Sequence, residues 1–261
     1  MMVMSNVLTV QSVDRALEII EKLKDNPNGI GVTDLSVMLG VSKSTVHRLL
    51  MSLSQGNYVK KDSVTERYQL GLKFLELGDI VSENLDVRKL ASPLLKELST
   101  KTSETVHLVV MEYNEVVYID KVESPETIRM YSRVGKRASM HCTGVGKVFL
   151  AHLPEWDVER IIKEKPMVKF TENTLITKED LFIELRRIKS KGYAIDNEEH
   201  EVGVKCIAAP IIDYKGNIIA AVSVSAPIMR LNDEKFELMK QEVLYYSQKI
   251  SELLGNFFTI V

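Results

Sequence analysis

The chain has 261 residues, of which 45% are hydrophobic and 27% charged, with 13 glycines and 7 prolines. This composition is typical of an ordinary globular protein and excludes disordered and collagen-like chains. The length favours two domains. The formal net charge is only −2, but binding to nucleic acid depends on where charges gather rather than on their sum.

The sequence has no long apolar run and no signal-peptide pattern at its start. Its two cysteines, Cys142 and Cys206, lie far apart in the sequence and form neither a disulfide framework nor a CxxC zinc motif. We therefore expect a cytoplasmic protein with reduced thiols and no membrane partner.

Three short helices are predicted near the start of the chain. Apolar residues recur there every three or four positions, as on one face of a helix. The expected N-terminal caps are Ser12, then Thr33 or Asp34, then Ser42, and Gly40 is expected to end the second helix. The third helix buries a stripe made of Val46, Leu49, Leu50 and Leu53.

The opposite side of the third helix is polar and basic. No Asp or Glu occurs from Leu35 to Lys61, and a carboxylate there would repel a phosphate backbone. Such a helix after a short helix and a turn is typical of a helix-turn-helix, and predicted strands at 58–60 and 67–70 fit a wing. The alternative is a small helical bundle with a solvated face. The candidate DNA-binding residues are Ser42, Lys43, Ser44, Thr45, His47, Arg48, Lys60 and Lys61.

A helical connection is predicted after this first domain. The pattern is helical from Gly71 to about residue 102, with a break at 82–86, and Pro93 suits the start of a helix better than its middle. We place the first domain at 1–70, a helical linker at 71–85 and a second domain at 86–261. An apolar seam of Leu70, Phe74, Leu77 and Val81 either meets a partner chain or packs on its own domain.

The second domain mixes hairpins and helices. Strands are predicted at 104–111, 115–123, 127–134, 204–212 and 217–225, and helices at 144–153, 155–164, 176–192 and 233–254. Thr177 is expected to cap the third of these helices and Gly192 to end it. This order indicates an α+β domain in which helices cover an antiparallel sheet.

The stretch MHCTGVGKVFLAH, residues 140–152, allows several interpretations. A phosphate loop is disfavoured because the glycine spacing is wrong and Lys147 is followed by valine. A nucleophile with its base, Cys142 with His141, is disfavoured because neighbours on a strand point to opposite faces. Zinc could be bound by both cysteines with some of His107, His141 and His200, but no pair has a recognised ligand spacing.

The remaining interpretation uses the backbone of this stretch. Thr143 can cap a helix whose first turn contains Gly144 and Gly146, and unpaired N–H groups at a helix start bind carboxylate or phosphate. An ordinary helix cap without a ligand is the alternative. Ser223 and Ser225 alternate along a predicted strand, so both can face one side.

Together these segments resemble the IclR family of bacterial transcriptional regulators. The matching segments, in order, are SKSTVHRLL with the wing RYQLG, then ETVHL, RMYSRVGKR, HCTGVGKVFLA, GYAIDNEEHEVGVKCIAAPI and GNIIAAVSVS. They span most of the chain, from about Val10 to Leu254. The segments RMYSRVGKR and DNEEHEVGVKCIA look most like KdgR-like members, which sense 2-keto-3-deoxygluconate and related sugar acids.

The resemblance implies an N-terminal winged helix-turn-helix and a C-terminal α+β, GAF-like effector domain with an antiparallel sheet. It also implies dimerisation through the first domain and assembly into homotetramers. Ligands of the family lie between the start of the GxGK helix and the concave sheet. Carried onto this chain, the ligand-binding residues are Gly144, Val145, Asp196, Cys206, Ser223 and Ser225.

We therefore expect a repressor that controls genes of sugar-acid or related carboxylate catabolism. It would bind a near-palindromic double-stranded DNA operator as a dimer or tetramer, and respond to a small keto or sugar acid. We expect no catalytic residue, no metal and no cofactor. The alternative function is a small-molecule hydrolase or kinase that uses His141, Cys142 and Lys147.

Overall fold

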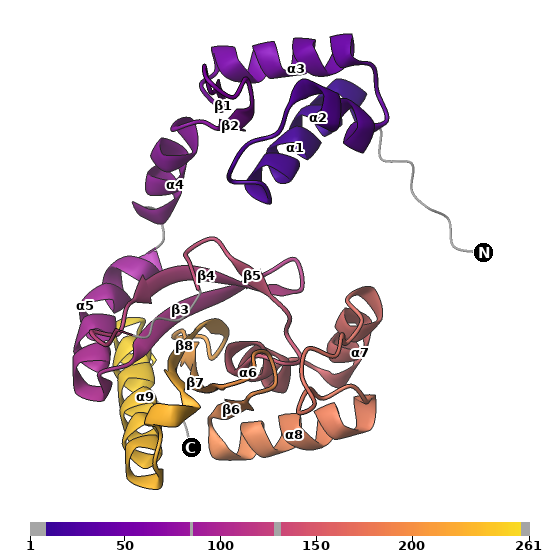
Figure 1. Ribbon diagram of the computed structural model, residues 1–261. Helices are drawn as coiled ribbons and strands as arrows, with labels where there is room; N and C mark the ends of the chain where they lie inside the picture. Colours follow the sequence, from indigo (N-terminus) through magenta and orange to yellow (C-terminus); the bar gives the residue numbers. More distant parts are fainter. Residues whose placement is uncertain (1–8, 84–85, 128–131, 257–261) are drawn as a thin grey trace. The chain divides into compact units, whose positions relative to one another are not determined.

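The computed structural model describes residues 9–83, 86–127 and 132–256. The chain forms two compact units, Met1–Asn84 and Leu85–Val261 (Figure 1). Each unit has its own buried apolar core. No helix among the described residues is long and apolar enough to cross a membrane.

The first unit is a helix-turn-helix with a small wing, as the sequence predicts. The α2–α3 connection is tight because Gly40 adopts the left-handed conformation that ends α2 and Ser42 accepts a hydrogen bond from the N–H of Thr45 to start α3. Antiparallel β1 and β2 form the wing. The elements of this unit are α1 (Gln11–Lys24), α2 (Val32–Leu39), α3 (Lys43–Gln55), β1 (Val59–Lys61), β2 (Tyr68–Leu70) and α4 (Lys73–Glu83).

Two of the predicted caps are wrong. The first helix begins one residue before Ser12, with Val10 as its cap residue, and α2 begins after Gly31 rather than at Thr33 or Asp34. Neither cap residue that the structure uses offers a side-chain hydrogen bond. Backbone bonds supply the first contacts instead, for example from the N–H of Leu35 to the carbonyl of Gly31. Cap propensity alone therefore misplaced both caps by two or three residues.

The predicted apolar seam of the fourth helix is partly used inside its own unit. The ring of Phe74 packs edge-on against Tyr58 of the winged helix, with centroids 5.6 Å apart. The more exposed apolar side chains of this region are Leu72, Leu75 and Ile80. The side chain of Val81 lies outside the described residues.

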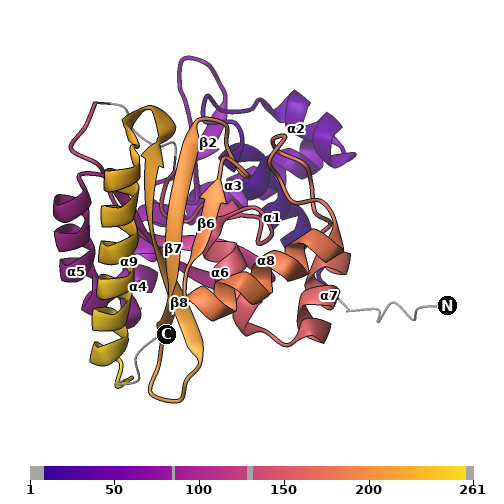
Figure 2. The ribbon, with the colours of Figure 1, turned by 90° about the horizontal axis from the view of Figure 1, so that it is seen from below.

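The second unit is built on a six-stranded antiparallel sheet with the order β5-β4-β3-β8-β7-β6. Helices α5 and α9 cover one face, while α6 packs on the other with α7 and α8 beyond it (Figure 2). The strands are β3 (Thr105–Glu112), β4 (Glu115–Val122), β5 (Arg137–Ala138), β6 (Ala194–Asn197), β7 (Val204–Ile212) and β8 (Ile218–Pro227). The helices are α5 (Asp86–Thr102), α6 (Gly144–His152), α7 (Glu155–Glu164), α8 (Lys178–Lys191), η1 (Ile228–Arg230) and α9 (Asp233–Leu253).

Three predictions for this unit differ from the structure. Pro93 lies inside α5 rather than at its start, because the helix packs Ala91, Leu95 and Leu98 into the core and this outweighs the local preference. The predicted strand at 127–134 includes 128–131, outside the described residues, and its described part is not strand; the edge strand is β5 instead. Strand β6 was not predicted.

Alternation along the strands divides the side chains between the two faces of the sheet. In β8, Val222 and Val224 join the core under α5 and α9, so Ser223 and Ser225 face α6. The same alternation in β3 turns His107 toward α6, between Val106 and Leu108 on the other face. In both strands, polar side chains among hydrophobic neighbours therefore lie on the face of the sheet that α6 covers.

Candidate functional site

The predicted DNA-contacting face of α3 is exposed. Lys43, Ser44, His47 and Arg48 are exposed, while Val46 and Leu50 are buried in the core of the unit. Thr45 is half-buried. The hydroxyl of the exposed Ser42 lies 2.9 Å from both the Ser44 and the Thr45 hydroxyls. These three hydroxyls therefore form a local cap network, whereas His47 and Arg48 project from the helix beyond it.

The two lysines of the wing differ in their surroundings. Lys61 forms an ion pair with Glu66 across the turn, whereas Lys60 has no ion pair among residues 9–83. The turn is fixed by Asp62, whose carboxylate accepts hydrogen bonds from the N–H groups of Val64 and Thr65 at 3.0 and 2.7 Å. Lys61 is thus held in an ion pair within the wing, whereas Lys60 interacts there only through the more distant charge of Asp62.

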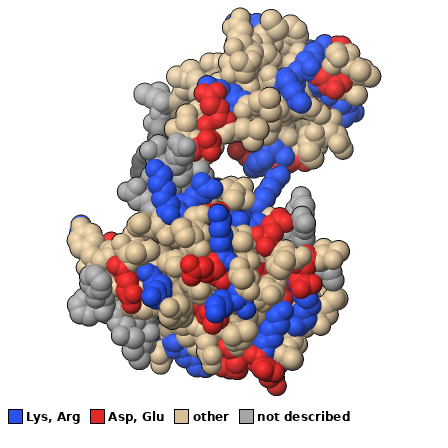
Figure 3. Space-filling model, turned by 90° about the vertical axis from the view of Figure 1, so that its left-hand side faces the viewer, with Lys and Arg blue, Asp and Glu red and all other residues tan. Residues whose placement is uncertain are grey.

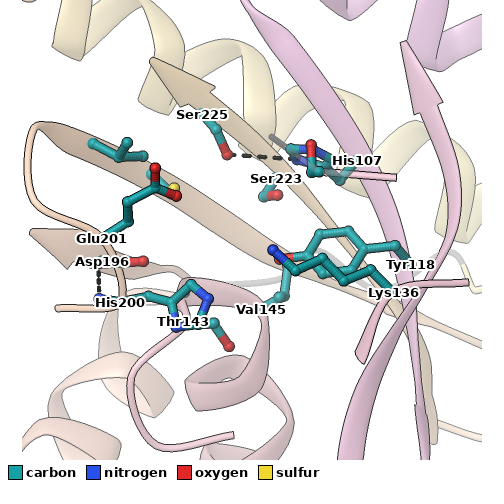
Figure 4. Close-up of a pocket in the computed structure, with 14 residues that line it drawn as sticks. His107, Tyr118, Lys136, Thr143, Val145, Asp196, His200, Glu201, Ser223 and Ser225 are labelled. Atoms are coloured by element: carbon teal, nitrogen blue, oxygen red, sulfur yellow. Dashed lines mark hydrogen bonds between the residues drawn. The ribbon is translucent and has the colours of Figure 1, made fainter. Parts of the chain in front are cut away.

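A polar pocket opens in the second unit between the sheet and the start of α6 (Figure 4). Strand register builds its sheet side. Asp196 of β6 pairs with Cys206 of β7, which pairs with Ser225 of β8. In the next row Ser223 of β8 pairs with His107 of β3. Because directly paired residues project to the same face, this register brings together side chains that are far apart in the sequence.

The N-terminus of α6 forms the opposite wall. Thr143 caps the helix, its hydroxyl accepting from the N–H of Gly146 at 3.1 Å, as the sequence predicts. The N–H groups of Gly144 and Val145 have no hydrogen-bond partner among the described residues, and both residues line the pocket. Unpaired donors at a helix start carry partial positive charge. This wall can therefore bind an anion without a cationic side chain.

The glycines of this helix allow close packing. A side chain at Gly146 would place its Cβ 2.3 Å from the Met140 carbonyl oxygen, which is a steric clash. A Cβ at Gly144 would lie 3.3 Å from the Cβ of Ala208 on the sheet. Gly144 thus lets the helix start pack closely on the sheet, and Gly146 lets the loop at Met140 pack closely on the helix.

All six predicted ligand-binding residues line this pocket of about 540 Å³, a volume that includes its open mouth. Figure 4 shows Ser223, Ser225 and His107 on the sheet side, and Thr143 and Val145 on the helix side. The other lining residues, which were not predicted as ligand-binding, are His107, Tyr118, Ser132, Lys136, Thr143, His200, Glu201 and Val204. Two sequence signals could have identified some of them, namely the helix cap at Thr143 and the lone histidine within the apolar stretch of ETVHL.

Burial controls the charge of the pocket. Burial, with the ammonium groups of Lys121 and Lys136, lowers the pKa of His107 to about 3, so its imidazole is neutral at physiological pH. One ring nitrogen of His107 lies 2.7 Å from the Ser132 hydroxyl and the other 3.5 Å from the Ser225 hydroxyl. Burial also raises the pKa of Asp196 to about 7. The pocket thus holds a neutral imidazole and a carboxyl group that titrates near neutrality, and the side chains of Lys136 and Glu201 also line it.

The geometry does not support the enzymatic interpretations of residues 140–152. The His141 ring contacts the carbonyl of Val168 at 3.0 Å, and the thiol of Cys142 lies 3.5 Å from His200 instead. Burial raises the pKa of Cys142 to about 12, so the thiol is not ionised at neutral pH. The Lys147 ammonium is buried in an ion pair with Glu199. None of these groups is available as a nucleophile, base or phosphate ligand.

The suggested zinc ligands do not form a common site. Among residues 9–83, 86–127 and 132–256, no group of three or more His, Cys, Asp and Glu side chains could hold a metal ion. The rings of His107 and His141 are instead engaged with Ser132 and Val168.

On the face of the larger unit that Figure 3 shows, Lys and Arg are interspersed with Asp and Glu, without a broad region of one sign. Such a surface lacks the electrostatic pattern of a DNA-binding face.

A winged helix-turn-helix with a basic recognition helix, followed by a domain with a polar pocket, defines a DNA-binding transcriptional regulator.

Comparison with known proteins identifies the family. Residues 12–63 match the IclR helix-turn-helix domain, and residues 80–252 match the C-terminal domain of bacterial IclR transcriptional regulators. The chain is 35% identical over 246 residues to the regulator XynR of Escherichia coli, covering 94% of this chain and 98% of XynR. It is 36% identical over 247 residues to the regulator KdgR of the same organism, covering 95% and 94%.

A solved structure agrees with these matches. The Thermotoga maritima IclR structure superposes with a TM-score of 0.78 at 32% identity, covering 94% of this chain and 99% of that one. The chain belongs to the IclR family of bacterial transcriptional regulators. It is a DNA-binding regulator rather than an enzyme.

Proposed function

We propose that this regulator is a repressor of genes for the catabolism of sugar acids or related carboxylates, and that a small keto or sugar acid controls its binding to DNA. The observation that carries the proposal is the pair of unpaired N–H groups of Gly144 and Val145, two residues that line a pocket whose opposite wall carries the hydroxyls of Ser223 and Ser225. A carboxylate on these donors needs no buried cation.

The rest of the ligand would meet polar groups that suit an oxygenated carbon chain. Hydroxyls of Ser223 and Ser225 can each donate or accept, and the Asp196 carboxyl can pair with a ligand hydroxyl. Cys206 would pack beside the chain, since burial raises the pKa of its thiol and keeps it neutral. A purely apolar ligand would leave these buried polar groups unpaired, at a cost in free energy.

DNA recognition in this proposal uses α3 and the wing. Ser44, Thr45, His47 and Arg48 would lie near base edges in the major groove, while Lys43, Lys60 and Lys61 would lie nearer phosphates. Ser42 would remain at the phosphate-facing end of the helix, where it caps α3.

The regulator would bind DNA as a homodimer that assembles further into a homotetramer. A single winged helix presents few contacts, and two-fold symmetry matches a near-palindromic operator. The exposed apolar side chains Val13 and Leu17, on one side of α1, support a partner there, since each is more than half exposed in the single chain (53% and 56%).

The test combines a thermal-shift screen with DNA binding. The screen covers pyruvate, gluconate, 2-keto-3-deoxygluconate and the matched neutral alcohols. Hydroxylated keto acids should raise the melting temperature and change affinity for the operator upstream of the regulated genes, because ligand binding stabilises the folded state. Deletion of the gene should raise transcription from that operator. Stabilisation by the alcohols but not by the acids, or a fall in transcription on deletion, would contradict the proposal.

A further inference from the structure

A buried lysine and a buried glutamate lie directly behind the wall of the pocket. Lys147 of α6 is 1% exposed and Glu199, in the turn after β6, is 7% exposed. The ammonium of Lys147 forms an ion pair with one carboxylate oxygen of Glu199, and it donates to the backbone carbonyl of Ile195 at 2.7 Å. Neither side chain is among those that line the pocket.

These contacts bracket Asp196 on both sides. Ile195 precedes it, and Glu199 follows it by three residues. One oxygen of the Asp196 carboxyl accepts from the N–H of Glu199 at 2.7 Å and, at 3.4 Å, from the N–H of His200. The orientation of the Asp196 carboxyl therefore depends on where the turn at 197–203 holds those two N–H groups.

From this geometry we propose that Lys147 and Glu199 are positioning residues of the effector site, whose buried ion pair holds the turn at 197–203 so that Asp196 faces the ligand. The inference rests on the proposed function in so far as the pocket binds an effector. The positioning itself is a property of the ligand-free protein and can be measured without one.

The same ammonium connects both walls of the pocket. Lys147 follows Gly144 by three residues, which is about one helical turn, so it lies in the same turn of α6 as the N–H donors. Through Glu199 it holds the turn that carries His200 and Glu201 to the pocket. Loss of the ion pair should therefore change the separation between the helix N-terminus and the Asp196 side of the pocket.

Other contacts hold the backbone of the turn, whereas the Glu199 side chain has only the ion pair with Lys147 and a long hydrogen bond, at 3.5 Å, from the N–H of Asn197. The hydroxyl of Thr171 donates to the carbonyl of Glu198, and that of Thr174 to the carbonyl of Glu199, each at 2.6 Å. The second oxygen of the Glu199 carboxylate is buried with no hydrogen-bond partner among the described residues. Burial of a partly unsatisfied carboxylate is costly for stability alone, which favours a functional reason for keeping it.

The ion pair also acts on the charge of Asp196. After burial, which is the largest influence, the neighbouring Glu199 carboxylate raises the pKa of Asp196 and the Lys147 ammonium lowers it. Removing one partner or the other should therefore move that pKa in opposite directions. The other titratable groups that face the pocket or influence Asp196 are His107, Tyr118, Lys136, Cys142, His200, Glu201 and Cys206.

The first experiment is hydrogen–deuterium exchange of the ligand-free full-length protein. In the double variant Lys147→Met with Glu199→Met, the amides of Glu199 and His200 should exchange at least about tenfold faster than in the wild type. This variant should fold, because apolar residues of similar volume can replace a buried ion pair. Lys178→Met is the matched control, since it removes a lysine from a half-exposed ion pair with Glu159. Exchange in the double variant equal to that in the wild type would overturn the proposal.

The second experiment measures binding of 2-keto-3-deoxygluconate by calorimetry as a function of pH. In the wild type, affinity for this anion should fall as Asp196 ionises. The midpoint should move to lower pH in Glu199→Gln and to higher pH in Lys147→Met, whereas general loosening of the fold would weaken binding at every pH without such opposite shifts. If the pH midpoints of the wild type and the two variants are the same, the electrostatic coupling of the ion pair to Asp196 is refuted. If the wild type binds no acid, the proposed function fails, and the exchange experiment still decides the positioning role.

Discussion

Ser223 and His107 lie directly opposite each other on the neighbouring antiparallel strands β8 and β3, and both face the pocket. The neutral imidazole of His107 is already engaged with Ser132 and Ser225. No hydrogen bond of the Ser223 hydroxyl occurs within the described parts of the chain. The pairing therefore leaves a hydroxyl that a ligand can use, beside a ring that is fixed.

Replacement of Ser223 by alanine should weaken binding of the effector without unfolding the protein. One lost neutral hydrogen bond costs about 0.5 to 1.5 kcal/mol, so the dissociation constant should rise severalfold. Isothermal calorimetry with the strongest acid from the thermal-shift screen would measure it. Cys142→Ala is the control and should leave DNA regulation nearly intact, because that thiol has no assigned chemistry. An unchanged dissociation constant in Ser223→Ala would remove Ser223 from the site.

The basic residues of the first unit should fall into two functional classes. Arg48→Ala should weaken specific operator binding by about 1 to 3 kcal/mol and broaden sequence preference, because it would lose contacts with base edges. Lys60→Ala should weaken binding to all DNA alike and reduce the slope of affinity against salt by about one.

Lys61→Ala is the matched control for Lys60→Ala. Its effect should be smaller, because Glu66 already compensates the charge of Lys61 within the wing. Fluorescence anisotropy with operator and scrambled duplexes at several salt concentrations would separate the classes. Equal losses for Lys60→Ala and Lys61→Ala, or operator affinity unchanged in both Arg48→Ala and Lys60→Ala, would reject this assignment.

Local sequence patterns predicted much of the fold because several elements are specified by local chemistry. Helix α8 is capped at its start by Thr177, whose hydroxyl accepts from the N–H of Asp180, and at its end by Gly192 in the left-handed conformation, both as predicted. Strand β7 spans the predicted residues 204–212. Where signals were short or mixed, tertiary packing decided instead. Strand β6, which reads AIDN, is only four residues long and exists because it pairs with β7.

The pocket was predictable only in part for the same reason. The cap at Thr143 and the glycines that follow it are local signals. The pairing of pocket residues across β6, β7, β8 and β3 depends on the order of the strands in the sheet, and the periodicity of the sequence does not reveal that order. Without the resemblance to a known family, Asp196 and Cys206 would not have been associated with Ser223 and Ser225. Lys136 reaches the pocket from a turn, where the sequence has no periodic signal at all.

Oligomerisation should depend on the exposed side of α1. Leu17→Glu should shift the protein toward monomer at micromolar concentration, because it would place a charge in an apolar interface. Since Leu17 is 56% exposed in the single chain, the monomer should keep its fold. Light scattering and circular dichroism would measure both effects. Val64→Glu, at a position that is 88% exposed in the wing, is the control and should leave the assembly unchanged. A Leu17→Glu protein with wild-type mass would exclude α1 from the interface.

The final prediction concerns the pH dependence of stability at Asp196. Burial raises its pKa in the folded protein to about 7, above the ordinary value of 3.8. Between these values the folded state binds more protons than the unfolded state at this site, so its contribution to the free energy of unfolding falls as pH rises from about 4 to 7. The folded protein therefore bears the full cost of an ionised Asp196 above pH 7.

Asp196→Asn removes this titration but keeps an oxygen that can accept from the N–H groups of Glu199 and His200. The free energy of unfolding of the variant minus that of the wild type should therefore rise by about 2 to 3 kcal/mol as the pH rises from 5 to 8. The variant is compared with the wild type at each pH because other groups also make stability depend on pH. The buried His107 and His200, whose pKa values are lowered, are such groups, and they affect both proteins alike. Urea unfolding at fixed protein concentration would measure it.

Asp213→Asn is the matched control for this prediction. Hydrogen bonds from the N–H groups of Asn217 and Lys215 lower the pKa of the half-buried Asp213, so its ionised form stabilises the fold and is already present at pH 5. That variant should show the same difference from the wild type at pH 5 and pH 8. If the stability difference between Asp196→Asn and the wild type is also the same at pH 5 and pH 8, Asp196 is ionised throughout this range. Binding of anionic effectors should then also be independent of pH, because the charge that opposes them would not change.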